Sequence, residues 1–562
     1  MRRPTAVSLI SIAVLISACS AFPDNSGNGS DGDSSTTEPG EPDDPVASCI
    51  RFTGNHSTNI DTGGLATDAL HLSGEAFTCA DDVVVVAEGD LNAIAAASQL
   101  AAAVSGPLLF PEPRLASELG RLKPERVHLV GSPQVNVPSS AETVEHDIAS
   151  ALDLVAETLG TTGETSVPAT PEASTIVEAV LAIHDGDRVA VPQTTGPGTT
   201  SAAPEIDEDA LVTGLIEGSD SSSLWMVDAS EPDTILLAAA VGHSLDASVV
   251  AFDSDDILGY PELAGTLEGG SSDSTRFVGG APEDARWELE VLASGQQVPG
   301  GGFHVLPEGE PRRYLAYYGH PGTDDLGVLG EQGPAETLDA MQELIQDYSG
   351  DGARVIPTFE MIASVASGGP TDDGDYSYEW PPDKFQPWVD FAEENDMYVV
   401  LDLQSGRDDF LSQAMQYEEL LRLPHVGLAL DPEWRLKPDQ THLNQIGSVT
   451  AAEVNETINW VADLVRDEGI PQKMITVHQF RTSMIQNRQD IVNRPEVQVI
   501  IQMDGEGSEP LKDATWKRLL EGADDAHWAW GWKNFFDEDE PGPMPPENVM
   551  GKEPTPVYVS YQ

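Results

Sequence analysis

The sequence predicts an α/β protein in which two small parallel-sheet units precede a C-terminal (β/α)8 barrel. Two observations support this architecture. Between residues 82 and 280, short apolar runs alternate with amphipathic segments, which is typical of parallel strands joined by crossover helices. From Arg312 onward, eight further apolar runs alternate with helical segments over about 250 residues, the usual length of such a barrel. A chain of 562 residues is also too long for a single core.

The chain is strongly acidic. It has 28 basic and 95 acidic residues and a formal net charge of −67. Like charges repel, so this excess argues against nucleic acid or anionic lipid as the partner of the folded part. It favours a protein that stays soluble at high salt, and an ordinary acidic secreted protein is the alternative. We find no P-loop, dinucleotide fingerprint, G-x-S-x-G elbow, EF-hand loop or HExxH motif, and therefore predict no cofactor and no metal.

Residues 1–19 have the pattern of an export signal. Arg2-Arg3 precedes an apolar run, Ala6–Ile16, that is too short to span a bilayer comfortably. The run leads into the tetrapeptide ISAC, which ends at Cys19 and resembles the lipobox of bacterial lipoproteins. The resemblance implies cleavage before Cys19 and its lipidation (palmitate), which would anchor the protein to the extracytoplasmic face of the plasma membrane. A plain secretory signal is the alternative.

Residues 20–48 are rich in Ser, Gly, Asp, Pro and Thr, which predicts a disordered tether. If Cys19 is lipidated, Cys49 and Cys79 remain as an even pair in an oxidising compartment. We expect a disulfide between them, joining the start of the first unit to the segment before its first strand. Two unpaired buried thiols are the alternative.

The first unit is predicted at residues 49–160 and the second at 161–308. In the first, we expect strands at 82–88, 107–110 and 126–130, with helices at 91–104 and 114–122. In the second, we expect strands at 224–227, 247–252 and 275–278, with a helix at 234–243. The same order of elements at domain scale indicates an internal duplication.

The first unit resembles the type 2 cell wall-binding repeat of Gram-positive surface proteins. The matching segments are Glu88-Gly89-Asp90, the SGPLL run that ends at Leu109, and the VHLVG run that ends at Gly131. Ser132 replaces a second glycine of the family pattern, whereas the second unit keeps Gly279-Gly280 but lacks the G-x-P strand start. The resemblance covers about residues 50–285. It implies two Rossmann-like units that hold an anionic wall polymer, and a spacer of the same fold that binds nothing is the alternative.

The barrel is predicted at residues 309–562. We expect its strands at 314–319, 354–359, 398–403, 426–431, 474–480, 497–504, 527–532 and 557–561. We expect helices at 335–348, 384–395, 409–423, 451–468, 482–492 and 511–521. The seventh connection, 535–555, is Pro-rich and acidic, so its helix should be short or absent. A doubly wound open sheet is the competing architecture.

The fourth strand delivers two carboxylates to one place. Side chains alternate along a strand, so Gly427, Ala429, Asp431 and Glu433 share one face, with bulky apolar residues on the other. This is the pattern of a barrel strand whose outer face packs on helices and whose C-terminal end carries the chemistry. The alternative is that DPEW forms a turn with a solvated pair of acids.

Polar residues also collect at the ends of the other predicted strands. They are Glu360 on strand two, Asp402 and Gln404 on strand three, His478 and Gln479 on strand five, Gln502 and Asp504 on strand six, and Trp530, Trp532 and Lys533 on strand seven. Burying several carboxylates together costs stability unless they are paired or solvated. A functional cleft at this end of the barrel is therefore the expected compensation.

Paired carboxylates suit glycosidic cleavage, which needs one protonated and one ionised carboxyl group. The D-x-E on strand four resembles the motif of barrel muramidases and several other glycoside hydrolases, in which the Glu is the acid. The resemblance implies Glu433 as general acid. Asp431 would be either its pKa-tuning neighbour or the second carboxylate, and Asp504 is the other candidate for the second carboxylate. The predicted substrate-binding residues are Asp402, Gln404, His478 and Gln502, with Trp530 and Trp532 stacking on a sugar.

The same groups have other interpretations. The tryptophans could fill the end of the barrel, His478 could be a core histidine, and Asp402 could cap a helix. A divalent cation could lie among Asp402, Asp431, Glu433 and Asp504, although no local ligand spacing indicates one. We therefore predict a lipid-anchored, wall-associated protein whose partner is cell-wall polysaccharide or peptidoglycan and whose barrel cleaves or binds a glycan. A non-catalytic envelope protein is the alternative.

Overall fold

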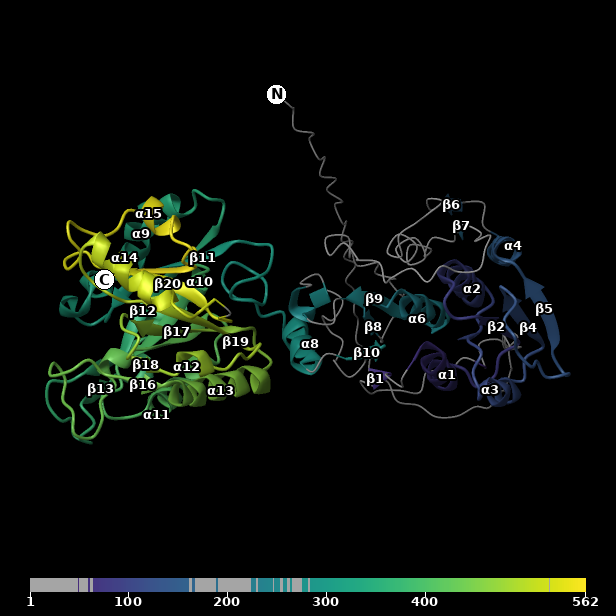
Figure 1. The fold of residues 1–562 in the computed structure, drawn as a ribbon, viewed down its shortest axis with the longest axis horizontal. Coiled ribbons are helices and arrows are strands. Elements are labelled where there is room, and N and C mark those ends of the chain that lie inside the picture. Colours follow the sequence, from purple (N-terminus) through teal and green to yellow (C-terminus); the bar gives the residue numbers. More distant parts are fainter. Residues whose placement is uncertain are drawn as a thin grey trace, which may run out of the picture. The chain divides into compact units, whose positions relative to one another are not determined.

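The structure is a computed structural model of the 562-residue chain (Figure 1). It describes residues 49, 59–60, 64–160, 164–166, 188–190, 224–228, 231–245, 247–252, 256–259, 263–264, 275–281, 284–524 and 526–562. The predicted signal peptide, the lipidated Cys19 and the tether lie outside these residues and stay predictions. Within the described residues, none of the helices combines the length and the apolar character that a membrane crossing requires.

The C-terminal part of the chain is a closed barrel of parallel strands (Figure 1). Its strands are β11 (Arg312–Gly319), β12 (Arg354–Ala366), β14 (Tyr398–Leu403), β15 (Val426–Leu430), β17 (Lys473–Gln479), β19 (Val497–Met503), β20 (Ala529–Asn534) and β21 (Tyr558–Tyr561). Neighbours in the chain are neighbours in the barrel, and β21 pairs with β11 to close it. All eight predicted strands are present, and the closure excludes an open sheet.

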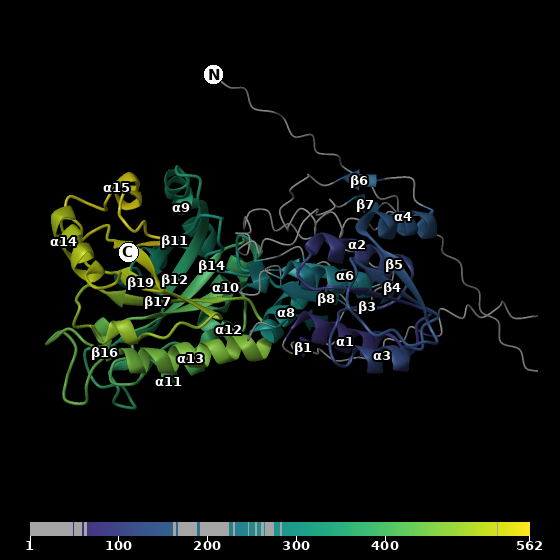
Figure 2. The ribbon, with the colours of Figure 1, turned by 45° about the vertical axis from the view of Figure 1, so that its right-hand side comes forward.

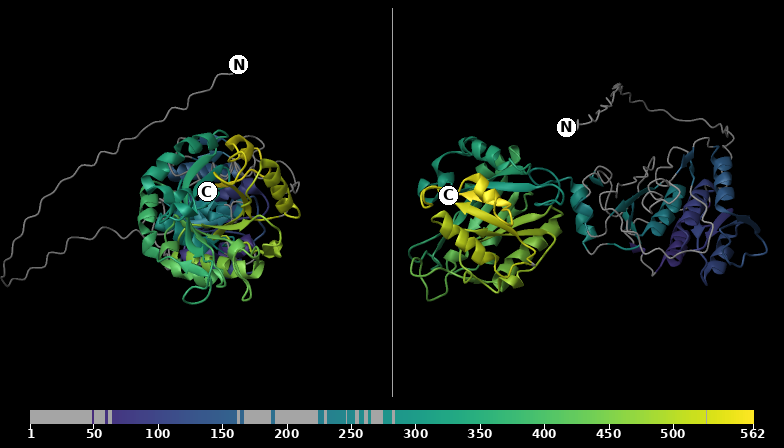
Figure 3. Two further views of the ribbon diagram at one scale, coloured as in Figure 1. Left: turned by 90° about the vertical axis from the view of Figure 1, so that its left-hand side faces the viewer. Right: turned by 45° about the horizontal axis from the view of Figure 1, so that its top comes forward.

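Helices surround this barrel on its outside (Figures 2 and 3). They are α9 (Pro334–Tyr348), α10 (Gln386–Glu394), α11 (Phe410–Ala414), α12 (Glu418–Leu421), α13 (Ala451–Glu468), α14 (Glu509–Leu520) and the short α15 (Pro546–Met550). The prediction of a helix at 482–492 is wrong. That segment forms β18 (Ile485–Gln486) and a short 3-10 turn, because Asn487 takes a left-handed conformation (φ 56°) that interrupts a helix.

The strands have the predicted alternation of faces. Ala429 belongs to the small cluster inside the barrel, whereas Val426, Leu428 and Leu430 belong to the large outer cluster that packs against the helices. Gly427 also faces inward, where a Cβ atom would lie 2.4 Å from the Met474 carbonyl oxygen. The small residues of strand four are therefore required by the narrow interior.

The N-terminal part contains two four-stranded sheets. One has the order β3 (Leu108–Leu109), β2 (Asp82–Val86), β4 (Arg126–Val130), β5 (Glu142–His146). The other has the order β1 (Asn59–Ile60), β10 (Thr275–Val278), β8 (Leu224–Asp228), β9 (Ser248–Phe252). The predicted division at residue 160 therefore needs correction, because β1 comes from the first predicted unit and pairs with β10 of the second.

The two sheets also share one hydrophobic cluster. The helices α2 (Leu91–Ala103) and α6 (Pro232–Leu245) contact each other across it, and the Ser98 hydroxyl on α2 donates to the Leu236 carbonyl on α6 at 2.7 Å. Both helices are rich in alanine, so their backbones can approach closely. The two sheets form one packed body.

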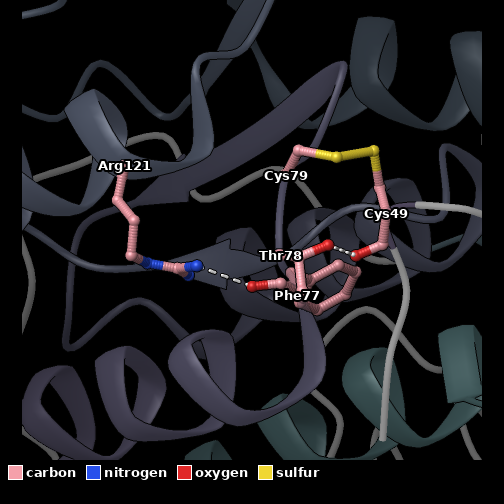
Figure 4. The surroundings of a disulfide bond; sticks show 5 residues. All are labelled: Cys49, Phe77, Thr78, Cys79 and Arg121. Atoms are coloured by element: carbon pink, nitrogen blue, oxygen red, sulfur yellow. Dashed lines mark hydrogen bonds between the residues drawn. A yellow bond between two sulfur atoms is a disulfide. The ribbon is translucent and has the colours of Figure 1, made fainter.

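Cys49 and Cys79 form the predicted disulfide (Figure 4). Their Cα atoms lie 4.8 Å apart and are separated by 30 positions in the sequence. Beside the bond, the backbone N–H and the hydroxyl of Thr78 both donate to the Cys49 carbonyl, at 2.7 and 2.9 Å. Arg121, on α3 (Leu115–Leu122), donates to the Phe77 carbonyl at 2.7 Å. The disulfide thus fixes the chain just ahead of β2.

Candidate active site

A cavity of about 830 Å³ opens at the C-terminal ends of the barrel strands. Its polar lining includes Tyr318, Gln404, Asp431, Glu433, Asp504 and Lys533, and its aromatic lining includes Trp434, Phe480 and Phe535. These residues come from six of the eight barrel strands or the turns that follow them. The predicted convergence of acidic residues on one cleft is therefore present.

Asp431 and Glu433 reach the cavity from a turn. β15 ends at Leu430, and Pro432–Trp434 form a 3-10 turn that Asp431 caps. The Asp431 Oδ1 atom accepts a hydrogen bond from the backbone N–H of Glu433 at 3.0 Å. This is an Asx turn, and Pro432 between the two residues favours it. The prediction that both carboxylates share one face of a strand is wrong, because the strand ends at Leu430, although both residues line the same cavity.

Glu433 is a partly buried carboxyl group that favours its protonated form. Burial raises the pKa of Glu433 to about 8, and the negative charges of Asp431 and Asp504 act in the same direction. The positive charges of Lys533 and His478 oppose this rise and do not overcome it. At neutral pH Glu433 can therefore donate a proton into the cavity.

Asp504 lies in the opposite electrostatic environment. Burial alone would raise its pKa, but the Lys533 ammonium and the His478 ring outweigh burial and lower the pKa of Asp504. Lys533 Nζ lies 3.3 Å from Asp504 Oδ1, and the same ammonium lies 3.5 Å from the centre of the Tyr318 ring. Asp504 is therefore held as a carboxylate.

His478 lies beneath these groups and is fully buried. Its Nε2 atom is 2.9 Å from Glu360 Oε1, and its Nδ1 atom is 3.1 Å from Asp504 Oδ2 and 3.7 Å from Asp431 Oδ2. Burial alone would lower the pKa of His478, but these three carboxylates outweigh burial and raise the pKa well above its usual value. His478 does not line the cavity, so it orients Asp431 and Asp504 from behind.

Asp402 and Gln404 form a second buried group. The Tyr318 hydroxyl donates to Asp402 Oδ2 at 2.8 Å and accepts from Gln404 Nε2 at 3.3 Å. Burial raises the pKa of Asp402 to about 8, with Asp431 and Glu360 adding to the rise and His478 opposing it. Gln404 reaches the cavity and Asp402 does not. Asp402 was predicted to contact substrate, but it lies behind the cavity and holds the Tyr318 hydroxyl instead.

Three other predicted residues lie away from the cavity. Gln502 points into the barrel, where its Nε2 atom donates to the Ser560 hydroxyl at 2.5 Å. Trp530 and Trp532 pack on the outer face of the barrel against Trp516 of α14, with ring centres 5.5 and 5.7 Å from that ring. The prediction that these tryptophans stack on a sugar is wrong, because side chains alternate along β20 and Lys533 occupies the inner face.

The polar cavity residues Tyr318 and Lys533 were not predicted as site residues, and neither were the aromatic Trp434, Phe480 and Phe535 or the buried Glu360 behind His478. Tyr318 ends the first strand, where a tyrosine in the apolar run RRYLAYYG looks like core. Glu360 and Lys533 are polar residues at strand ends, and the sequence alone assigns neither of them a role. The signal that could have identified Lys533 is its phase, because it is the inward-facing member of the Trp532-Lys533 pair.

The structure also brings together groups that could hold a metal ion. Asp402, Asp431 and His478 each offer one ligand atom, and these atoms lie within 4.8 Å of one another. They belong to three adjacent strands or strand ends, which explains why no local spacing in the sequence indicated a metal. A second, more exposed group consists of Asp373, Asp375 and Glu379.

The fold and the cavity together define a (β/α)8 barrel with a carboxylate-lined pocket at the strand ends. No protein-family model matches the sequence, and no curated protein matches it. Among solved structures, Cwp6 from Clostridium difficile is 13% identical with a TM-score of 0.33, and the match covers 63% of this chain. The chain spans 64% of the length of Cwp6.

A second match is Thermotoga maritima Cel5A, a mutant form solved in complex with its cellobiose substrate. It is 11% identical with a TM-score of 0.26, and the match covers 45% of this chain and 88% of that one.

Proposed function

We propose that the barrel cleaves glycosidic bonds in a cell-envelope glycan. The observation that carries this proposal is that Glu433 and Asp504 line one cavity, while only Asp504 has a lysine partner, 3.3 Å away. Two carboxyl groups in contrasting environments are what the reaction requires, because one must give a proton and the other must carry negative charge.

In this mechanism, Glu433 gives its proton to the glycosidic oxygen as the bond to the anomeric carbon breaks. Asp504 either attacks that carbon or takes a proton from the attacking water, and one water molecule is consumed per bond in both cases. Asp431 adds negative charge beside Glu433, and Gln404 and Tyr318 offer polar groups to the sugar hydroxyls. Trp434, Phe480 and Phe535 offer apolar faces.

The remaining parts of the chain suit a protein held at the cell surface. We propose that lipidated Cys19 anchors it to the outer face of the plasma membrane, and that the two N-terminal sheets contact cell-wall polysaccharide or peptidoglycan. The support is the lipobox-like ISAC sequence and the repeat-like motifs of the first unit. The disulfide agrees with an oxidising compartment outside the cytoplasm.

The test is to incubate the full-length protein with purified wall polysaccharide fractions and to measure both the reducing ends released and the protein retained on the insoluble fraction. We expect wild type to release reducing ends from at least one fraction. Retention without release from any fraction would indicate a glycan-binding envelope protein that is not an enzyme. If the protein is neither retained by any fraction nor releases reducing ends, a wall glycan is not its partner.

A further inference from the structure

The three residues Asp402, Asp431 and His478 form a compact buried cluster behind the cavity. They come from β14, the end of β15 and β17, which are neighbours in the barrel. One ligand atom of each lies within 4.8 Å of the other two, and the three residues are 0%, 2% and 0% exposed. Two oxygens and one imidazole nitrogen at this spacing match the donor set of a transition-metal site.

Among the residues that the structure describes, two atoms of the cluster have no hydrogen-bond partner. Asp402 uses Oδ2 to accept from Tyr318, but its buried Oδ1 atom accepts nothing. The Nδ1 atom of His478 makes no hydrogen bond of acceptable geometry, although Asp504 Oδ2 is only 3.1 Å away. A buried polar atom without a partner destabilises the fold, so two such atoms facing one cluster indicate a place for a bound group.

The other nitrogen of His478 is already committed. Its Nε2 atom bonds to the fully buried Glu360 carboxylate at 2.9 Å, which leaves Nδ1 as the atom that faces the cluster. Histidines that bind metals have this arrangement, in which a carboxylate behind the ring fixes its orientation and tautomer. Glu360 therefore serves the cluster as an outer partner.

Carboxyl groups outnumber cationic groups around the cluster. The carboxyl groups are those of Glu360, Asp402, Asp431, Glu433 and Asp504, and the cationic groups that contact them are the Lys533 ammonium, which pairs with Asp504, and the His478 ring. A divalent cation bound to Nδ1 would take the place of the ring proton there and bring two positive charges where the proton brings one. The charge around the cluster is therefore compatible with a bound cation.

We propose that Asp402, Asp431 and His478 bind a divalent transition-metal cation, for which Zn²⁺ is the appropriate probe. The imidazole nitrogen favours Zn²⁺ over Ca²⁺ and Mg²⁺, which prefer all-oxygen sites. Asp431 also lines the cavity, so the ion is reachable from solvent. This inference goes beyond glycan cleavage and holds for any substrate, because it concerns the occupancy of the cluster itself.

The chain offers a matched control in its other acidic cluster, Asp373, Asp375 and Glu379. That cluster is more exposed, and its carboxylates already have neighbours, because Thr371 donates to Asp375 and to Asp373 at 2.5 and 2.7 Å. Non-specific attraction of cations to a chain of net charge −67 would affect both clusters alike. A specific metal site at Asp402, Asp431 and His478 would bind Zn²⁺ more tightly than the exposed cluster does.

The experiment is calorimetric titration of the full-length, EDTA-treated protein with Zn²⁺. We expect one tight site in wild type, the loss of that site in Asp402→Asn, and its retention in Asp375→Asn. Glu360→Gln keeps all three ligands and loses only the outer partner, so its affinity should fall about 10- to 100-fold. The Co²⁺-loaded protein provides a spectroscopic readout, since its visible spectrum should change in His478→Gln.

Two results would overturn the proposal. One is that titration of the wild-type protein shows no Zn²⁺ site with a stoichiometry of one ion per chain. The other is an Asp402→Asn variant that is folded by circular dichroism and binds as tightly as wild type. If Asp402→Asn fails to fold, the Glu360→Gln affinity and the Co²⁺ spectrum decide the question. None of these readouts depends on glycan turnover, so the metal site and the proposed reaction can fail separately.

Discussion

His478 Nε2 lies 2.9 Å from Glu360 Oε1, and this contact joins the fifth barrel strand to the second across the interior. Both side chains are fully buried. Removing Glu360 takes away one of the three carboxylates that contact the buried His478 ring, and breaking a buried pair typically costs about 3–5 kcal/mol. We therefore expect Glu360→Leu to lower the free energy of unfolding by this amount in urea denaturation. Glu343→Gln, on the exposed face of α9, is the control and should change it by less than about 0.5 kcal/mol. Equal stability of Glu360→Leu and wild type would contradict the pairing.

The Lys533 ammonium lies 3.5 Å from the centre of the Tyr318 ring. A desolvated cation–π contact of this kind contributes about 2 kcal/mol. A double-mutant cycle with Tyr318→Leu and Lys533→Met should therefore give a coupling energy of about 1–2 kcal/mol in unfolding measurements. Strictly additive effects of the two substitutions would show that the ring does not stabilise the lysine.

The Cys49–Cys79 disulfide closes a loop of 30 positions. A loop of this length predicts a stabilisation of about 3–4 kcal/mol, mostly through the unfolded chain. We expect the free energy of unfolding of the N-terminal sheets to be lower by that amount in the double variant Cys49→Ser, Cys79→Ser. Its unfolding should therefore occur at a lower denaturant concentration. Intact mass before and after reduction should differ by two hydrogen atoms, and an unchanged mass would mean that the thiols are free.

Glu288 is a buried carboxyl group on α8 (Ala285–Ser294). Burial raises its pKa to about 8, the charges of Asp256 and Asp284 add to the rise, and Arg466 opposes it. Between about pH 4.5 and pH 8, the Glu288 carboxyl group is therefore protonated in the folded state and ionised in the unfolded state. Stability should consequently fall as pH increases from about 4.5 to about 8, by an amount on the order of 4 kcal/mol.

Replacing Glu288 by Gln removes this titration. We expect Glu288→Gln to flatten the dependence of unfolding free energy on pH between about 5 and 8, whereas the exposed Glu308→Gln should leave the slope unchanged. A slope that is identical in wild type and Glu288→Gln would assign the pH dependence to other groups.

The barrel could be predicted because each strand carries its own alternation of small or polar inner residues and bulky outer ones. The strand around Gly427 and Ala429 illustrates this, since the inner positions have no room for large side chains. The same rule, applied strictly, would have placed Lys533 inside and both Trp530 and Trp532 outside. Counting all three as residues of one rim ignored that neighbours on a strand face opposite ways.

Other features depend on contacts that no local pattern encodes. β1 has two residues and pairs with β10, which lies far along the chain, so its place in the second sheet could not be read from its neighbours. The Asp402–Asp431–His478 cluster likewise combines separate strands. Tyr318 was hidden because a tyrosine within an apolar strand resembles core until its hydroxyl is seen to contact Asp402.

The central claim is that Glu433 supplies the proton for glycosidic cleavage. It is tested most directly by the rate at which wild type, Glu433→Gln and the surface variant Glu343→Gln release reducing ends from the same wall polysaccharide. Loss of a general acid typically costs a factor of about 10² to 10⁴. We predict that loss for Glu433→Gln, with unchanged stability, and a wild-type rate for Glu343→Gln. Release by Glu433→Gln at the wild-type rate would contradict the account.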